Sequence, residues 1–291
     1  MTGTGRRWLE LSARCPPDDD ASSLLVEALL SLGGRAAEER DGWILTHLPA
    51  PADLDALLDE ARGMLRAATG VDSIEVRTIW REHEEWSETW KRGLGPRRIT
   101  DRILVHPSWL PAPADRAEAT IVLDPGMAFG TAEHGTTRGC LRLLDRAIGD
   151  GDDVLDVGAG SGILAIAAVL LGASSCVAVE ADALSCEALR ENVERNGVAD
   201  RVSCVEARLD AQGLARLGPV AGVLANIETG VLAPLLPSFA RAVAPGGWLI
   251  LSGILEGEWH ALRTRVEEAG FRFIALDADD EWRSGLFTHT G

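Results

Sequence analysis

Residues 153–171 read DVLDVGAGSGILAIAAVLL, and this stretch decides the fold. It contains an apolar run of strand length, then three glycines at alternate positions, then an uninterrupted apolar helix. Gly158, Gly160 and Gly162 permit a tight turn and let a ligand approach the backbone without a Cβ in its way. The stretch therefore predicts a buried strand, a ligand-binding turn and the helix that packs back onto the sheet.

The strand, turn and helix pattern repeats through the rest of the chain. Further strands are expected at residues 176–180, 202–205, 220–225 and 248–251. Strands that alternate with helices form a mostly parallel sheet covered on both faces, which is a doubly wound, Rossmann-like α/β architecture. The last two strands, 271–276 and 283–289, follow each other without a helix, so we expect one antiparallel strand at the edge of the sheet.

The first 80 residues show a different order of elements. Their alternation and helical spacing predict three strands and two helices, the strands at 7–15, 43–48 and 73–80 and the helices at 24–32 and 53–68. This order suits a small α+β sandwich of ferredoxin-like type. Residues 81–115 mix charge, tryptophan, Gly and Pro and are expected to be a connector. The predicted organisation is a small domain at 1–80, the connector, and an α/β domain at 116–291.

Composition limits the classes of function. The chain has 291 residues, 28 Lys and Arg against 45 Asp and Glu, and a formal net charge of −17. Such an acidic protein is not expected to hold naked nucleic acid directly, and suits a basic partner or simply a need for solubility. No apolar run of about 18 residues and no signal-like leader occur, so we expect no membrane span and a cytoplasmic location. The cysteines are scattered, which argues against a metal site, and nothing points to an oligomeric state.

An acidic residue after the glycine turn points to the ligand. Glu180 ends the next strand, where its carboxylate can accept hydrogen bonds from both ribose hydroxyls of an adenosine. The G-x-G-x-G spacing differs from the G-x-G-x-x-G of dinucleotide binders. Together with the antiparallel closing strand and Asp156 before the loop, it favours S-adenosylmethionine over NAD, although an NAD-dependent oxidoreductase stays an alternative. Asp156 is expected to orient the methionine part of the cofactor or to brace the loop itself.

Two further segments carry polar groups suited to a ligand site. Residues 124–137, DPGMAFGTAEHGTT, suit a loop folded over a ligand, although Thr136 and Thr137 could instead cap the following helix and His134 could be structural. Asn226 ends the strand at 220–225. Ligands of open α/β sheets bind outside the carboxyl ends of the strands, so Asn226 is expected where the chemistry takes place.

Together these segments resemble the ribosomal protein L-eleven methyltransferase family, called PrmA. The resemblance rests on EEWSETWKRGLGPRRITDRILVHPSW, LDPGMAFGTAEHGTT, LDVGAGSGILAIAAVLLGA, NIETG and LSGIL, and it covers nearly the whole chain. It implies a class I S-adenosylmethionine-dependent methyltransferase domain preceded by a ferredoxin-like substrate-recognition domain. The implied substrate is a large-subunit ribosomal protein, methylated on its N-terminal amine or on lysine side chains. The family's cofactor contacts would fall on Thr137, Gly158, Glu180 and Asn226.

The chain departs from the family pattern at two places. Ala132, Glu133 and Gly135 replace the Gly, Thr and Pro of the usual F-G-T-G-T-H-P-T-T loop, and Glu180 replaces an Asp. The implied reaction is attack of a neutral amine on the sulfonium methyl group, and Asn226 could orient that amine as the catalytic residue. Residues 226–229 read NIET and not N-P-P-Y. Planar amides and nucleic-acid bases are therefore less favoured than amines as methyl acceptors. Two alternatives stay open. The substrate could be a lysine of another protein or a small amine, or the chain could be a binding module without turnover.

Overall fold

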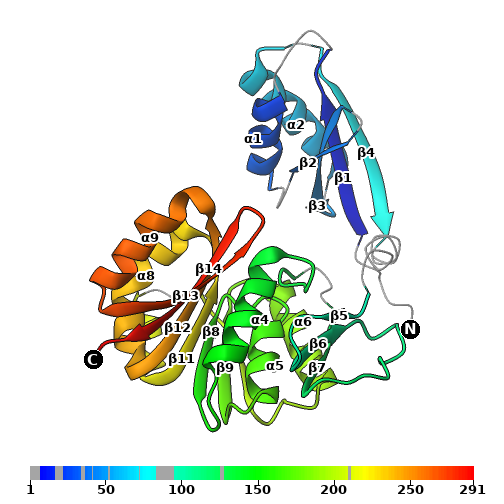
Figure 1. Ribbon diagram of the computed structural model, residues 1–291. Coiled ribbons are helices and arrows are strands. Elements are labelled where there is room, and N and C mark those ends of the chain that lie inside the picture. Colours follow the sequence, from blue (N-terminus) through cyan, green and yellow to red (C-terminus); the bar gives the residue numbers. More distant parts are fainter. Residues whose placement is uncertain are drawn as a thin grey trace. The chain divides into compact units, whose positions relative to one another are not determined.

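The computed structural model divides the chain into two compact units, Met1–Gly93 and Leu94–Gly291 (Figure 1). The structure describes residues 7–16, 22–33, 37–40, 42–51, 53–71, 73–82, 95–124, 128–208 and 211–291. Most of the expected connector before residue 95 lies outside the described residues. The same holds for residues 125–127 of the 124–137 segment, which was expected to fold over a ligand. Each unit has its own hydrophobic core, so the two are described separately.

The N-terminal unit is a four-stranded antiparallel sheet with two helices. Its elements are β1 (Arg7–Arg14), α1 (Ser22–Ser31), β2 (Ala37–Arg40), β3 (Trp43–Pro49), α2 (Leu54–Thr69) and β4 (Glu75–Glu82). The strand order is β2-β3-β1-β4, which with this element order is the ferredoxin-like arrangement. Leu9 and Leu11 alternate onto the helix face of β1 and are fully buried against the helices. The expected α+β sandwich is therefore confirmed, with β2 as an additional strand.

The C-terminal unit is built on a seven-stranded sheet. Its strands are β8 (Asp153–Val157), β9 (Ser175–Glu180), β10 (Val202–Glu206), β11 (Val220–Asn226), β12 (Val243–Leu255), β13 (Phe271–Asp279) and β14 (Trp282–His289). They lie in the order β10-β9-β8-β11-β12-β14-β13. β14 runs antiparallel to both of its neighbours, and the pairings among β8 to β12 are parallel. The mostly parallel sheet is confirmed.

The position of the antiparallel strand corrects the expectation. β14 lies between β12 and β13, so the strand at that edge of the sheet is β13. The connection from β12 to β13 passes through α9 (Glu256–Glu268) and leaves a gap of one strand beside β12. The hairpin that follows β13 turns β14 back into this gap, where it completes the hydrogen bonds of both neighbours.

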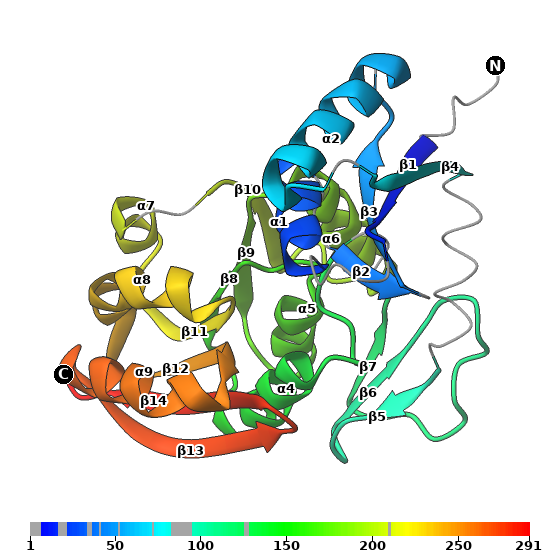
Figure 2. The same ribbon diagram turned by 90° about the horizontal axis from the view of Figure 1, so that it is seen from above.

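Helices cover both faces of this sheet, as Figures 1 and 2 show. α4 (Gly135–Ala147), α5 (Ile163–Leu170) and α6 (Ala183–Arg195) lie on one side, and α8 (Thr229–Ala242) and α9 on the other; the short α7 (Ala211–Arg216) precedes β11. Side-chain alternation separates the two cores: Val154 belongs to the cluster under α4 and α5, and Leu155 to the cluster under α8 and α9. The doubly wound architecture is confirmed.

A three-stranded sheet precedes α4 and was not expected from the sequence. It consists of β5 (Arg97–Arg98), β6 (Ile103–His106) and β7 (Ala119–Val122), in that order. Ile103 and Ile121 are fully buried in the cluster that also holds α4 and α5. Residues 95–115 therefore belong to the C-terminal unit, whereas the sequence placed them in a connector.

Candidate functional site

The glycine turn opens onto a cavity of about 330 Å³ at the carboxyl ends of β8, β9 and β11. Four of the predicted residues line it: Gly158, Gly160, Glu180 and Asn226. Thr137, Asp156 and Gly162 lie outside its lining. The remaining walls are mostly apolar, with Val157, Val179, Ala181, Ala207, Ile227, Val231 and Leu235. A pocket with apolar walls and a few placed polar groups is typical of a small-molecule site.

The glycines permit close contacts within the protein that side chains would prevent. Gly158 and Gly160 have φ angles of 74° and 53°, in the left-handed region that L side chains rarely adopt. A Cβ at Gly158 would lie 2.5 Å from Cγ2 of Ile227, and one at Gly160 would overlap the carbonyl oxygen of Phe129. Both glycines also line the cavity, so the turn, called the cradle below, presents backbone without side chains to it.

Glu180 connects the cradle to the next strand. One carboxylate oxygen accepts a hydrogen bond from the Gly160 N–H at 2.9 Å, and the other accepts from the N–H groups of Ala181 and Asp182 at 2.7 and 2.8 Å. Carboxylate oxygens have further acceptor capacity, so the same group can also receive ribose hydroxyls. Glu180 thus braces the glycine turn from inside the cavity, a role that sequence reasoning did not find.

Asn226 meets Thr137 across the sheet end. The Asn226 amide Nδ2 lies 3.5 Å from the Thr137 hydroxyl, a long hydrogen bond, and Thr137 is fully buried in the first turn of α4. The Asn226 Oδ1 atom is buried and has no hydrogen-bond partner among the described residues. A buried acceptor without a donor is costly, so this atom marks a place where a ligand donor would be stabilised.

Asp156 lies on the other face of β8. It is fully buried, and neither carboxylate oxygen has a hydrogen-bond partner among the described residues, although the Ala165 N–H of α5 lies close enough to act on its pKa. Strand alternation puts Asp156 on the opposite face from Val157, which lines the cavity. Its place outside the cavity lining argues against direct contact with a ligand in that cavity, and because its oxygens make no hydrogen bond to the described residues, the bracing role stays a prediction.

Burial raises the pKa of Asp156 to about 7, and the nearby charge of Glu180 acts in the same direction. The pKa of this carboxyl is higher in the folded protein than its value of about 3.9 in the unfolded chain. The free energy of unfolding therefore falls as the pH rises from the unfolded to the folded pKa. The folded protein thus loses on the order of 4 kcal/mol from this group between about pH 4 and pH 8.

We expect Asp156→Asn to remove this pH dependence. Relative to the wild type, the variant should gain stability from about pH 4 to 7 and then level off, because its amide does not titrate. Urea unfolding of both proteins at several pH values measures the difference. A constant difference across this range would contradict the buried, protonated carboxyl.

The segment from residue 128 to His134 lies against the glycine loop. The Ser161 N–H donates to the Phe129 carbonyl at 2.8 Å, and the Ser161 hydroxyl donates to the Gly130 carbonyl at 2.6 Å. The Phe129 side chain lines the cavity, although 54% of the residue's surface is exposed. The loop predicted to fold over a ligand therefore forms one wall of the cavity.

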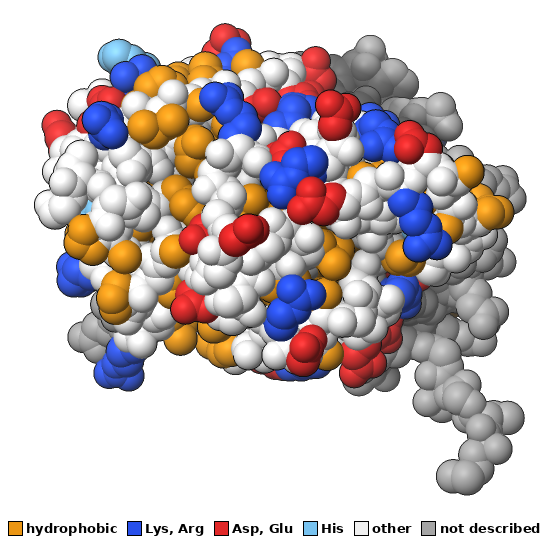
Figure 3. All heavy atoms as spheres, turned by 60° about the horizontal axis from the view of Figure 1, so that its bottom comes forward, with side chains coloured by type: hydrophobic (Ala, Val, Ile, Leu, Met, Phe, Trp, Pro, Cys, Tyr) orange, Lys and Arg blue, Asp and Glu red, His pale blue; other side chains and the backbone are white. Residues whose placement is uncertain are grey.

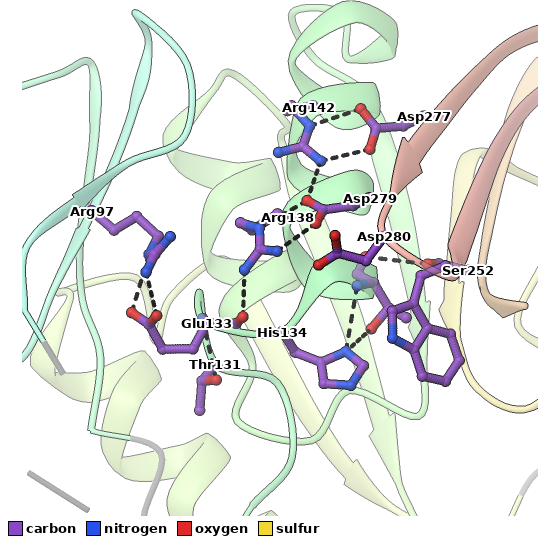
Figure 4. A network of polar contacts seen from close by, with 12 residues as sticks. Arg97, Thr131, Glu133, His134, Arg138, Arg142, Ser252, Asp277, Asp279 and Asp280 are labelled. Carbon is purple, nitrogen blue, oxygen red and sulfur yellow. Dashed lines mark hydrogen bonds and ion pairs between the residues drawn. The ribbon is translucent and has the colours of Figure 1, made fainter. Parts of the chain in front are cut away.

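His134 (Figure 4) is the N-cap of α4, and its side chain interacts with Thr136 of the first helical turn. Its Nδ1 atom lies 2.7 Å from the Thr136 hydroxyl and accepts from the Thr136 N–H at 3.4 Å. Burial, with the positive charge of Arg138, lowers the pKa of His134, which favours the neutral ring that such a cap needs. The ring also packs against Phe129 and Trp282, at centroid distances of 4.8 and 5.2 Å. The structural reading of His134 is the one its contacts support.

The charges of the cavity bear on the kind of adenosine ligand. Among the described lining residues, only Glu180 and Arg208 carry charge, and sequence reasoning missed Arg208. The amino end of α5, where a pyrophosphate would bind, has the buried Asp156 carboxyl beneath it. That carboxyl, with its pKa of about 7, is partly ionised at neutral pH, so a pyrophosphate would bring further negative charge close to it. The donor set therefore fits a phosphate-free adenosine better than a dinucleotide.

Comparisons with known proteins agree on one family. Residues 38–289 match the family described as ribosomal protein L11 methyltransferase (PrmA). A ribosomal protein L11 methyltransferase of Pelotomaculum thermopropionicum is 35% identical over 304 residues, covering 94% of this chain and 96% of that one. One of Pseudomonas putida (strain W619) is 41% identical over 290 residues, covering 94% and 97%. The crystal structure of a ribosomal protein L11 methylase from Lactobacillus delbrueckii subsp. bulgaricus has a TM-score of 0.60 at 29% identity, covering 68% of this chain and 100% of that one.

Proposed function

Because the chain belongs to the ribosomal protein L11 methyltransferase (PrmA) family, we propose that it methylates amino groups of ribosomal protein L11. It is an S-adenosylmethionine-dependent methyltransferase with the class I fold. The observation that carries the proposal for this chain is the meeting, in the lining of one cavity, of the glycine cradle, Glu180 and Asn226, whose buried Oδ1 atom has no partner among the described residues.

The residues present fit S-adenosylmethionine. Glu180 would accept hydrogen bonds from the ribose hydroxyls, the exposed backbone of Gly158 and Gly160 would lie against the ligand, and the apolar walls would enclose the adenine. Gly162 and Thr137 act indirectly. Gly162 is the N-cap that lets α5 begin, and the Thr137 hydroxyl holds the Asn226 amide. When bound, the cofactor supplies an electrophilic methyl group, and the protein supplies alignment and a water-poor pocket.

The acceptor amine must be neutral to attack. At pH 7 deprotonation costs roughly 4.6 kcal/mol for a lysine with a pKa near 10.4, and about 1 kcal/mol for an N-terminal amine with a pKa near 7.8. We assign the orientation of this amine to Asn226, because its Oδ1 atom has no partner among the described residues and can accept a hydrogen bond. The N-terminal amine is the easier acceptor, and a lysine acceptor needs desolvation as well.

Charge and organisation are in keeping with a protein substrate. The net charge of −17 suits a basic partner, and we propose direct action on the protein without contact to nucleic acid. On the face drawn in Figure 3, acidic and basic side chains are interspersed, without a basic patch for phosphates. We assign substrate recognition to the ferredoxin-like unit and a cytoplasmic location to the enzyme. Within the part of the chain that the structure describes, the helices are all too short or too polar to span a membrane.

The direct test is methyl transfer. Purified enzyme, ribosomal protein L11 and S-adenosylmethionine with a labelled methyl group should yield labelled L11, and mass spectrometry should locate the label on amine nitrogens. Transfer to other proteins of a ribosome-free lysate, with none to L11, would support the alternative of a different protein substrate. Binding of S-adenosylmethionine without transfer to any acceptor would support a binding module and contradict the proposal.

We expect Glu180→Gln to weaken cofactor binding about 10- to 100-fold without unfolding the protein. The loss follows from replacing charge-assisted hydrogen bonds, worth about 1.5–3 kcal/mol, by neutral ones. Titration calorimetry with S-adenosylhomocysteine measures it. Glu206→Gln is the matched control, because Glu206 is the register partner of Glu180 on β10 and lies outside the lining of the cavity. Equal affinity of the Glu180 variant and the control would remove the ribose assignment.

A further inference from the structure

Arg97 and Glu133 form an ion pair beside the cavity wall (Figure 4). Resting on the proposed function, we infer that this pair is a positioning device for methyl transfer. It holds residues 130–134 in the place that lets Phe129 form one wall of the cavity, with the His134 ring packed against it. Glu133 is one of the residues at which this chain departs from the family's loop pattern.

The pair has the geometry of a strong interaction. Arg97 Nε donates to Glu133 Oε1 at 3.1 Å, and Arg97 Nη2 donates to the other carboxylate oxygen. Such a two-point contact fixes orientation as well as distance. Both side chains are partly shielded, with 42% and 33% of their surfaces exposed. The Arg97 backbone is held in β5 by its pairing with Val105 of β6, so the arginine is a firm anchor.

A second arginine holds the same residue from the opposite side. Arg138 of α4 donates to the backbone carbonyl of Glu133. Arg138 is itself held by Asp279 through contacts of 2.9 and 2.5 Å, and Arg142 reaches Asp279 at 2.7 Å. These arginines hold the pKa of Asp279 well below its usual range, so the carboxylate stays charged at any ordinary pH. Glu133 therefore lies between two fixed guanidinium groups, one on its side chain and one on its backbone.

Packing alone does not fix this segment. A small cavity of about 20 Å³ lies next to it, lined by Thr131, Ala132 and Glu133 on one side and by His106 and Leu123 among the residues opposite. A space of this size holds about one water molecule, so side-chain packing is incomplete along this part of the segment. The polar anchors at Glu133 and the Ser161 contacts at Gly130 then determine its position.

A displacement of Glu133 would be transmitted to the cavity through His134. His134 follows Glu133, and its ring packs against Phe129, which lines the cavity. Alignment of two reacting groups is sensitive to displacements of about an ångström, which can cost on the order of 100-fold in rate. Because Arg97 and Glu133 do not line the cavity of the cofactor, their loss should affect turnover more than cofactor affinity.

The test compares Glu133→Gln, Arg97→Ala and the charge exchange R97E/E133R with the wild type. We expect kcat for L11 methylation to fall about tenfold in each single variant, with the KM for S-adenosylmethionine within about threefold of the wild type. Amide hydrogen exchange of residues 130–134 should become faster in both, and the charge exchange should restore most of the rate and of the protection. Arg98→Ala is the matched control, because Arg98 is the neighbouring residue of β5 and pairs instead with Asp115.

The results separate this inference from the proposed function. An active wild type whose rate and exchange stay unchanged in the single variants would overturn the inference alone. An equal effect of Arg98→Ala, or no recovery in the charge exchange, would also overturn it. If the wild type transfers no methyl group to L11, the proposed function fails, and the exchange measurement still decides whether the ion pair holds the segment.

Discussion

Gly160→Ala is expected to weaken cofactor binding by at least 100-fold. Gly160 has a φ of 53°, and a Cβ there would overlap the Phe129 carbonyl oxygen. That oxygen cannot move away cheaply, because it accepts the Ser161 N–H at 2.8 Å. The added methyl group must therefore distort the glycine turn or displace the wall that carries Phe129. Either change fills or misshapes the cradle in which the cofactor would lie.

Titration calorimetry with S-adenosylhomocysteine and a thermal melt test this expectation. Gly197→Ala is the control, because Gly197 has a similar φ of 66°, lies outside the lining of the cavity, and has open space within 4 Å of the point where a Cβ would lie. It should show the left-handed backbone penalty of about 1–2 kcal/mol in stability and normal binding. Gly158→Ala should be milder than Gly160→Ala, since its obstacle is the movable Ile227 side chain. Normal affinity in a folded Gly160→Ala protein would contradict the cradle.

Asn226→Ala is expected to lower kcat for methyl transfer by about 100-fold or more. The change removes the buried Oδ1 acceptor that would orient the amine, and misorientation of a reacting group costs on this scale. Because Asn226 also lines the cavity, cofactor affinity should fall by several-fold at most. Steady-state kinetics at saturating cofactor separate the two effects.

Thr137→Val is the accompanying variant. It removes the hydroxyl that holds the Asn226 amide and keeps the side-chain volume, so kcat should fall about tenfold with cofactor affinity unchanged. A rate within threefold of the wild type in Asn226→Ala would show that the amine is oriented by another group.

The sequence predicted the elements whose patterns are local and strong. β8 and α5 are buried along almost their whole length and read as apolar runs, so both were found. β2 was missed because its residues, AEER, are polar, and the three-stranded sheet was missed because β5 has only two residues. α8 was not expected, and it contains Pro234 and Pro237, which normally argue against a helix.

The site was predictable where one short segment determined it. The glycines and Glu180 lie at strand ends, and their position follows from the strand, turn and helix order. For Asp156 the sequence left two roles open; because neighbouring strand residues face opposite sides, Asp156 lies on the face of β8 away from Val157 and outside the cavity lining. The contacts of Asn226 with Thr137 and of Arg97 with Glu133 join residues 89 and 36 positions apart, so spacing could not predict them.

A crystal structure of the enzyme with S-adenosylhomocysteine tests the central claim most directly. We predict that the ribose hydroxyls lie within hydrogen-bond distance of the Glu180 carboxylate. The amino-acid part of the ligand should lie along Gly158 and Gly160, with its sulfur facing the side of the cavity that holds Asn226. A ligand bound elsewhere, or bound here with its ribose away from Glu180, would contradict the central claim.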